Sequence, residues 1–175
     1  MPPHVQLKLP TDSPKVQMAN RDAWNASLSV DEADFYTVGY SGRDIRSFIA
    51  ALEAASIVTL IDIRHTPVSM YKPDFSKRNL ERHLAESGIE YLHCPDLGVP
   101  RDIRSKAVHD SGREAIWEWY DEHVVPTVAS RNLHWFFNSA AHPIALMCTE
   151  IDPTACHRHR LALAWGRQGL KFFDL

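Results

Sequence analysis

The sequence predicts a three-layer, Rossmann-like α/β fold with a mostly parallel sheet of about five strands. Two observations predict it. Short, apolar, β-prone runs alternate with helical segments from residue 35 to the end of the chain. Strands separated by helices of this length pair in parallel through right-handed crossovers. The 175 residues, with 45% hydrophobic and 23% charged residues, suit one globular domain.

The strands are expected where apolar residues run almost without interruption. The segment 58–63 is nearly continuous in apolar residues, as expected of a strand that is covered on both faces. The segment 144–148 has the same character and ends at Cys148. The full set of expected strands is 35–40, 58–63, 89–93, 144–148 and 170–173.

The helices are expected where apolar residues recur at helical spacing between capping residues. Asp44 is placed to favour a helix N-terminus ahead of the apolar series at 45–52. Ser76 is a good N-cap for a second helix, which Gly88 ends. A loop through 97–100 leads to a helix-rich stretch from about 112 to 138, and a last helix is expected over about 154–168.

Residues 1–34 differ from the rest of the chain because they are rich in proline and lack periodicity. We interpret them as a mobile tail or a surface strap, with Trp24 and Leu28 as anchors, ahead of a single α/β domain over 35–175. The net charge of −3 excludes a general electrostatic attraction to nucleic acid or membrane. Three cysteines and the lack of a membrane-length apolar run favour a reducing, cytoplasmic location without membrane association.

Polar side chains follow three of the expected strands. Ser41 and Arg43 follow the first strand, and Asp62 and Arg64 lie at the end of the second. A buried carboxylate needs a partner, and the plain partner of Asp62 is Arg64 or Arg158. Because ligands gather at the carboxyl ends of parallel strands, we expect these groups to share one cleft with the residues after the fourth strand.

The segment after the fourth strand has the most specific pattern. It leaves a buried strand at Cys148, contains Glu150, turns at a proline and starts a helix near Cys156, His157 and Arg158. Backbone N–H groups at a helix N-terminus favour anions and lower the pKa of a nearby thiol. The guanidinium of Arg158 suits carboxylate or phosphate.

These motifs resemble the domain of unknown function 488 family over about residues 36–174. The resemblance implies a small cytoplasmic α/β fold, and the family name assigns no activity. Many relatives carry an arginine-rich stretch after the equivalent of Pro67, whereas this chain has Val68 to Lys72, which counts against phosphate contact by this loop. The matching motifs are Val38–Gly42, Ile61–Arg64 with Pro67, Phe75–Ser76, Leu97–Gly98 and the Cys-Thr-Glu…Pro…Cys-His-Arg segment.

The leading hypothesis is a small hydrolase or transferase that acts on a phosphate-bearing small molecule or nucleic acid. The catalytic candidates are Asp62, Glu150, Cys148, Cys156 and His157, and the substrate-binding candidates are Ser41, Arg43, Arg64, Arg158, Tyr71 and Lys72. Asp62 or Glu150 would be the general base, and Arg158 the anion clamp.

Three alternatives stay open, and so does oligomer formation. Cys148 or Cys156 could be the nucleophile of a sulfur or redox enzyme. No cofactor is predicted, but a transition metal bound by Cys148, Cys156 or His157 is the main competitor. Against it, the chain has no C-x-x-C pair, and the adjacent residues Cys156 and His157 would have to point the same way. A non-catalytic module that binds nucleic acid through the basic residues around Lys72 and Arg78 is the third alternative.

Overall fold

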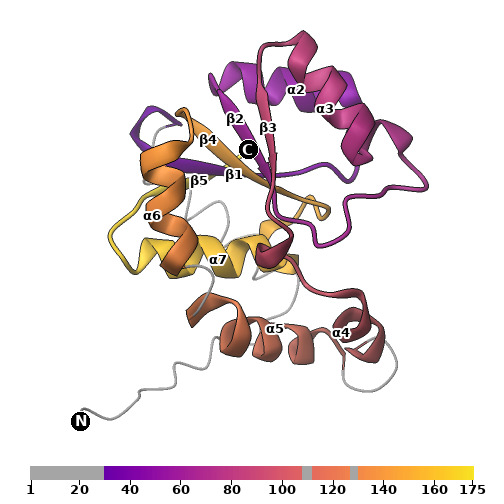
Figure 1. Ribbon diagram of the computed structural model, residues 1–175, viewed down its shortest axis with the longest axis vertical. Coiled ribbons are helices and arrows are strands. Elements are labelled where there is room, and N and C mark those ends of the chain that lie inside the picture. The colour runs from indigo at the N-terminus through magenta and orange to yellow at the C-terminus, as the bar shows by residue number, and fades with distance from the viewer. Residues whose placement is uncertain (1–29, 108–111, 127–129) are drawn as a thin grey trace.

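The computed structural model of the protein describes residues 30–107, 112–126 and 130–175, so the expected anchors Trp24 and Leu28 lie outside the described residues. The described residues form a five-stranded, all-parallel sheet in the order β3-β2-β4-β1-β5 (Figure 1). The strands are β1 (Phe35–Gly39), β2 (Thr59–Asp62), β3 (Glu90–His93), β4 (Ile144–Cys148) and β5 (Phe172–Asp174). The helices are α2 (Ile45–Ala54), α3 (Lys77–Glu86), α4 (Arg101–Lys106), α5 (Gly112–His123), α6 (Ser130–Ser139) and α7 (His157–Gly166).

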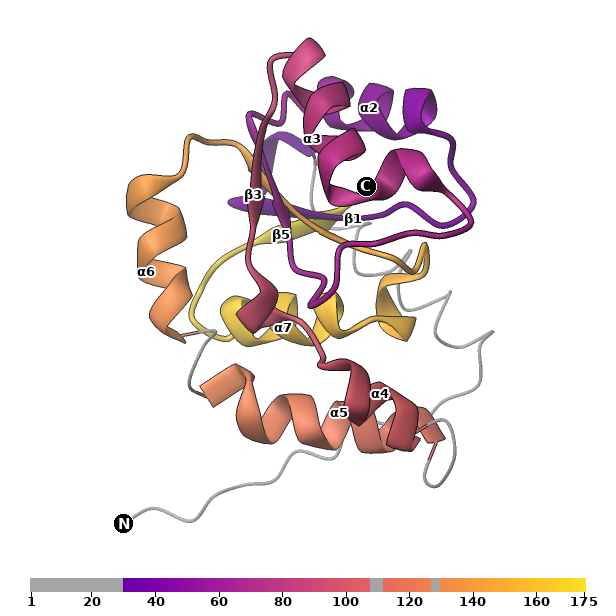
Figure 2. The same cartoon turned by 45° about the vertical axis from the view of Figure 1, so that its right-hand side comes forward.

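Helices cover both faces of the sheet, which confirms the three-layer prediction. Helices α2 and α3 lie on one face, and α6 and α7 lie on the other, with α4 and α5 beyond α7 (Figures 1 and 2). Because side chains alternate along a strand, Leu60 and Met147 join the core under α2 and α3, whereas Ile61 and Cys148 join the core under α7. Neighbouring residues of one strand therefore serve opposite faces.

The topology places the loop after β4 where ligands are expected. The segments that follow β1 and β4 run to opposite faces of the sheet, and these two strands are neighbours in it. The same holds for β2 and β4, so β4 lies at a switch point, where ligands bind in open parallel sheets. Among the described residues, no helix has the length and apolar character needed to cross a bilayer.

Apart from shifts of one residue at strand ends, the elements differ from the prediction in three places. Helix α4 was not predicted, because its six residues bury no side chain and so leave no apolar period in the sequence. Helix α7 begins at His157 rather than near residue 154, because Pro153 starts a short 3-10 turn and Cys156 has extended backbone. The last strand is shifted toward the C-terminus, to Phe172–Asp174.

Candidate functional site at the end of strand β4

The loop that carries Glu150 is held in place by contacts to its backbone. Gly39, in the neighbouring strand, packs so closely on this loop that a Cβ atom there would lie 1.8 Å from the Glu150 carbonyl oxygen. Arg158 is fully buried and donates to the carbonyl oxygens of Glu150 and Ile151 and to Oγ1 of Thr37. The predicted anion clamp is therefore a buried brace whose guanidinium is occupied by the protein itself. Arg158 positions the loop that carries Glu150.

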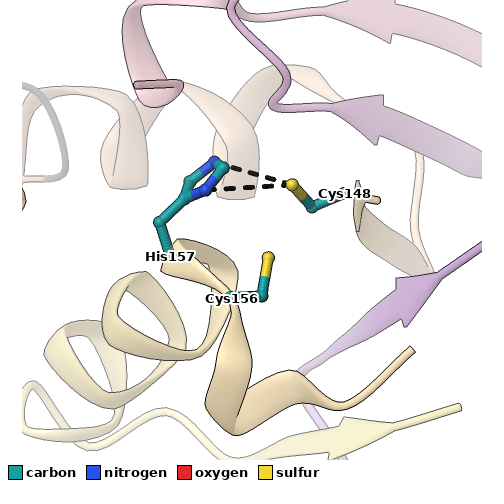
Figure 3. A group of neighbouring side chains, drawn as sticks. All are labelled: Cys148, Cys156 and His157. Atoms are coloured by element: carbon teal, nitrogen blue, oxygen red, sulfur yellow. Dashed lines mark hydrogen bonds between the residues drawn. The ribbon is translucent and has the colours of Figure 1, made fainter. Parts of the chain in front are cut away.

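Three side chains converge at the end of β4, and they belong to Cys148, Cys156 and His157 (Figure 3). The Sγ atom of Cys148 lies 3.7 Å from Oε2 of Glu150, and 3.8 Å and 3.7 Å from Nδ1 and Nε2 of His157. The two sulfurs and a ring nitrogen of His157 lie within 4.8 Å of one another. Cysteine and histidine at this mutual spacing are donors that a soft divalent ion could share.

Cys156 and His157 are adjacent in the chain, yet both side chains reach the cluster with Cys148. They do so because the backbone conformation changes from extended to helical between them. Cys156 is the N-cap of α7 with φ −130° and ψ 144°, and His157 is the first helical residue. An extended residue directly before a helical one aims its side chain differently from a residue within the helix. The sequence-based objection to their convergence is thereby removed.

The electrostatics of the cluster depend on its burial. Burial raises the pKa of Cys156 well above its ordinary value, and the nearby Cys148 sulfur raises it further. Burial lowers the pKa of His157, but negative charge at Cys156 and Glu150 and a hydrogen bond with the backbone of Ile63 outweigh it, so the pKa is raised. The exposed fractions of Cys148 and Cys156 are 3% and 1%. The thiols are thus shielded from solvent, and a positive charge at His157 is favoured.

A cavity of about 360 Å³ opens next to the cluster. Glu150 and His157 contribute to its wall, together with two arginines, Arg104 and Arg113. Its apolar lining includes Trp117 from helix α5. The volume is within the range typical of small-molecule sites. Four residues that carry ionisable groups therefore line one cavity: Glu150, His157, Arg104 and Arg113.

Asp62 and Arg64 lie on the other face of the sheet, so the expected single cleft does not form. Asp62 is fully buried and accepts from Nε and Nη2 of Arg64 at 2.8 and 2.5 Å, and from the Tyr91 hydroxyl at 2.7 Å. The guanidinium of Arg64 also donates to the Phe75 carbonyl at 2.8 Å and lies 5.2 Å from the centre of the Tyr40 ring. Burial lowers the pKa of Arg64, but the Asp62 carboxylate raises it more, so the guanidinium stays charged. Asp62 is in a structural ion pair.

The remaining substrate-binding candidates do not line the cavity. The backbone N–H of Ser41 donates to Thr149, and the guanidinium of Arg43 donates to the carbonyl of Leu175. Lys72 Nζ donates to the carbonyl of Arg43, and the Tyr71 side chain is 100% exposed. These four residues lie around the β1 and β2 loops and are not brought to the Cys148 cluster.

Arg104, Arg113 and Trp117 were not among the predicted site residues. A topological signal could have found them. From β1 to β3 the chain adds strands toward one edge of the sheet, and from β3 to β5 it adds them toward the other edge. Right-handed crossovers then require the connection between β3 and β4 to cross the same face as the helix after β4. Everything in that connection, from about residue 99 to 143, was therefore a candidate neighbour of the Cys148 segment. Arg104 and Arg113 are charged residues on its first two helices.

Fold and site together define a small parallel α/β protein with a cysteine, histidine and glutamate cluster at its topological switch point. The chain belongs to the family described as Domain of unknown function DUF488, whose model matches residues 44–164. The match includes the whole segment from Cys148 to Arg158. Neither curated proteins nor solved structures gave a match.

Proposed function

We propose that the protein is a hydrolase or transferase that acts on a small phosphate-bearing substrate of the nucleotide class, with Glu150 as general base. The observation that carries this proposal is that Glu150, His157, Arg104 and Arg113 line one cavity. The two guanidinium groups suit a phosphate, and the face of the Trp117 ring that Arg160 does not cover suits a base. A nucleotide contains both parts.

The chemistry assigned to Glu150 is proton transfer. Its carboxylate takes a proton from water or an acceptor hydroxyl, whose oxygen then forms a bond to the electrophilic atom of the substrate. The bond from that atom to the leaving group breaks, and the leaving group takes up the proton. Arg104 and Arg113 hold the anionic part of the substrate.

The test is a screen of nucleosides, nucleotides and short oligonucleotides, with products identified by mass spectrometry. Glu150→Gln keeps the shape of the side chain and removes its charge, so turnover should fall by about 10²–10⁴-fold. Glu86→Gln is the matched control, because Glu86 is an exposed residue of α3 that pairs with Arg82. Turnover by Glu150→Gln equal to that of the control would overturn the role of Glu150.

A second candidate is a thiol-dependent enzyme, favoured by the distances of 3.7 and 3.8 Å between Cys148 Sγ and the His157 nitrogens. Its weakness is access, since only 3% of Cys148 is exposed. A thiol mechanism passes through a covalent adduct on Cys148, so acid quenching during turnover followed by peptide mass mapping distinguishes it. An adduct on Cys148 supports this candidate, and turnover without one supports Glu150.

A further inference from the structure

We infer that Cys148, Cys156 and His157 bind one Zn²⁺ ion, leaving its fourth position open toward Glu150 and the cavity. This inference deepens the proposed function by naming the cofactor of the same site. The three residues bring together two thiolate donors and one imidazole donor, a set that zinc prefers.

The spacing of the donors fits a tetrahedral ion. In a zinc site, Zn–S bonds of about 2.3 Å and Zn–N bonds of about 2.0–2.1 Å place neighbouring donor atoms roughly 3.5–3.8 Å apart. Cys148 Sγ already lies 3.7 and 3.8 Å from the ring nitrogens of His157. The whole set lies within 4.8 Å, so closing it around an ion requires movements of no more than about 1 Å.

The charge of the site fits as well. Cys148 and Cys156 are almost completely buried on the α7 side of the sheet. Two thiolates and a neutral imidazole carry a charge of −2, which a divalent ion cancels, so the complex can be buried without an unpaired charge.

The open position determines what the ion does. Three protein ligands with a fourth position for water characterise catalytic rather than structural zinc sites. Oε2 of Glu150 lies 3.7 Å from Cys148 Sγ, and Glu150 lines the cavity. A water molecule on the ion would become acidic near neutral pH, and Glu150 would take its proton before the oxygen attacks the substrate. Glu150 is not among the donor atoms that lie within 4.8 Å of one another, so it is assigned to proton transfer and not to the set of ligands.

The experiment measures metal binding directly in the full chain. Metal-free protein titrated with Co²⁺ should develop thiolate-to-cobalt charge-transfer absorption that saturates at one ion per chain, and Zn²⁺ should displace the cobalt. Cys148→Ser and Cys156→Ser should each weaken binding by more than about 100-fold, since even loss of an outer contact weakens such sites by 10–100-fold. Cys94→Ser, the matched control outside the cluster, and Glu150→Gln should bind like the wild type.

X-ray absorption of the zinc-loaded wild type decides the ligand set if the serine variants fail to fold. Two sulfur neighbours at about 2.3 Å and one nitrogen neighbour confirm the inference. A shell of oxygen and nitrogen only, or equal Co²⁺ spectra for Cys148→Ser and Cys94→Ser, overturns it. Turnover that depends on Glu150 in metal-free protein would reject the metal and keep the proposed function. Zinc binding without turnover of any nucleotide would keep the zinc site and reject the proposed function.

Discussion

The ends of strands β2 and β4 carry polar groups that looked equally functional in the sequence, yet they differ in how tightly the groups are bonded. At the end of β2, Asp62 accepts hydrogen bonds of 2.5–3.0 Å from the Arg64 backbone and side chain and from Tyr91. At the end of β4, Cys148 meets Glu150 and His157 at 3.7–3.8 Å.

The difference separates a structural network from a candidate functional site. The Asp62 carboxylate is fully buried and already saturated by donors, so no acceptor capacity is left for a substrate. The β4 cluster is joined by the weaker hydrogen bonds of the Cys148 sulfur, and two of its members, Glu150 and His157, line a cavity. A charge with a full set of short internal hydrogen bonds maintains the fold, whereas groups held by weak sulfur hydrogen bonds beside a cavity are available for chemistry.

The largest expected effect is on stability and concerns the β2 end. Asp62→Asn leaves the Arg64 charge buried without its counterion, so the free energy of unfolding should fall by about 3–5 kcal/mol. Asp74→Asn is the control, because Asp74 is exposed and pairs with His83 at the surface, and it should change the same quantity by less than about 1 kcal/mol. Urea denaturation measures both. A stable Asp62→Asn variant with impaired zinc binding or turnover would mean that the two strand ends form one site.

The fold was predictable because it is set by local patterns that the chain repeats. The buried strand 144–148 was predicted to the residue, and Asp44 caps α2 by accepting from the backbone N–H of Ser47. Ser76 does precede α3, but its hydroxyl accepts from the backbone N–H of Ser69 instead of capping the helix. Capping patterns predict where a helix begins better than they predict the bonds made there.

The site was only partly predictable because strand-end rules indicate the edge of a sheet and not the face. The cluster of Cys148, Glu150, Cys156 and His157 was predicted, since all four belong to one segment. Asp62 was grouped with them because β2 and β4 are neighbours, but the register pairs Asp62 with Met147. In a parallel sheet, paired residues share a face, so the side chains of Asp62 and Cys148 lie on opposite faces of the sheet.

A smaller effect should come from Gly39, which connects the sheet to the β4 loop. Gly39→Ala places Cβ against the Glu150 carbonyl and must displace the backbone, so the free energy of unfolding should fall by about 1–3 kcal/mol. Turnover should fall by up to about 100-fold, because Glu150 moves with its backbone. Gly166→Ala is the control, since its Cβ would approach no atom closer than 3.7 Å and should leave turnover unchanged. Equal turnover for both alanine variants would contradict the positioning of Glu150 by this contact.

The cavity arginines should affect binding and leave stability unchanged. Arg104 and Arg113 are exposed, so replacing both by alanine should alter the free energy of unfolding by no more than about 0.5 kcal/mol each. Each lost hydrogen bond to a charged phosphate is worth about 1.5–3 kcal/mol, so KM for the substrate should rise by at least about 10-fold. Arg82→Ala, on α3 across the sheet, is the control. A similar rise in KM for Arg82→Ala would indicate general electrostatic attraction instead of a cavity site.

The smallest effect concerns Cys94, a cysteine at the β2–β3 side of the molecule that belongs to neither set of bonds. Burial raises its pKa to about 11, with further contributions from Asp96 and Asp62. The thiolate is the reactive form, so at pH 8 alkylation of Cys94 should be about 100-fold slower than that of a thiol with its ordinary pKa of 9. The rate should rise tenfold per pH unit until pH approaches 11. Pulsed alkylation with peptide mass mapping gives the rate for each cysteine.

Added zinc should protect Cys148 and Cys156 from alkylation and leave the alkylation rate of Cys94 unchanged. Protection of Cys94 by zinc would place it near the ion and join the two strand ends that the structure separates.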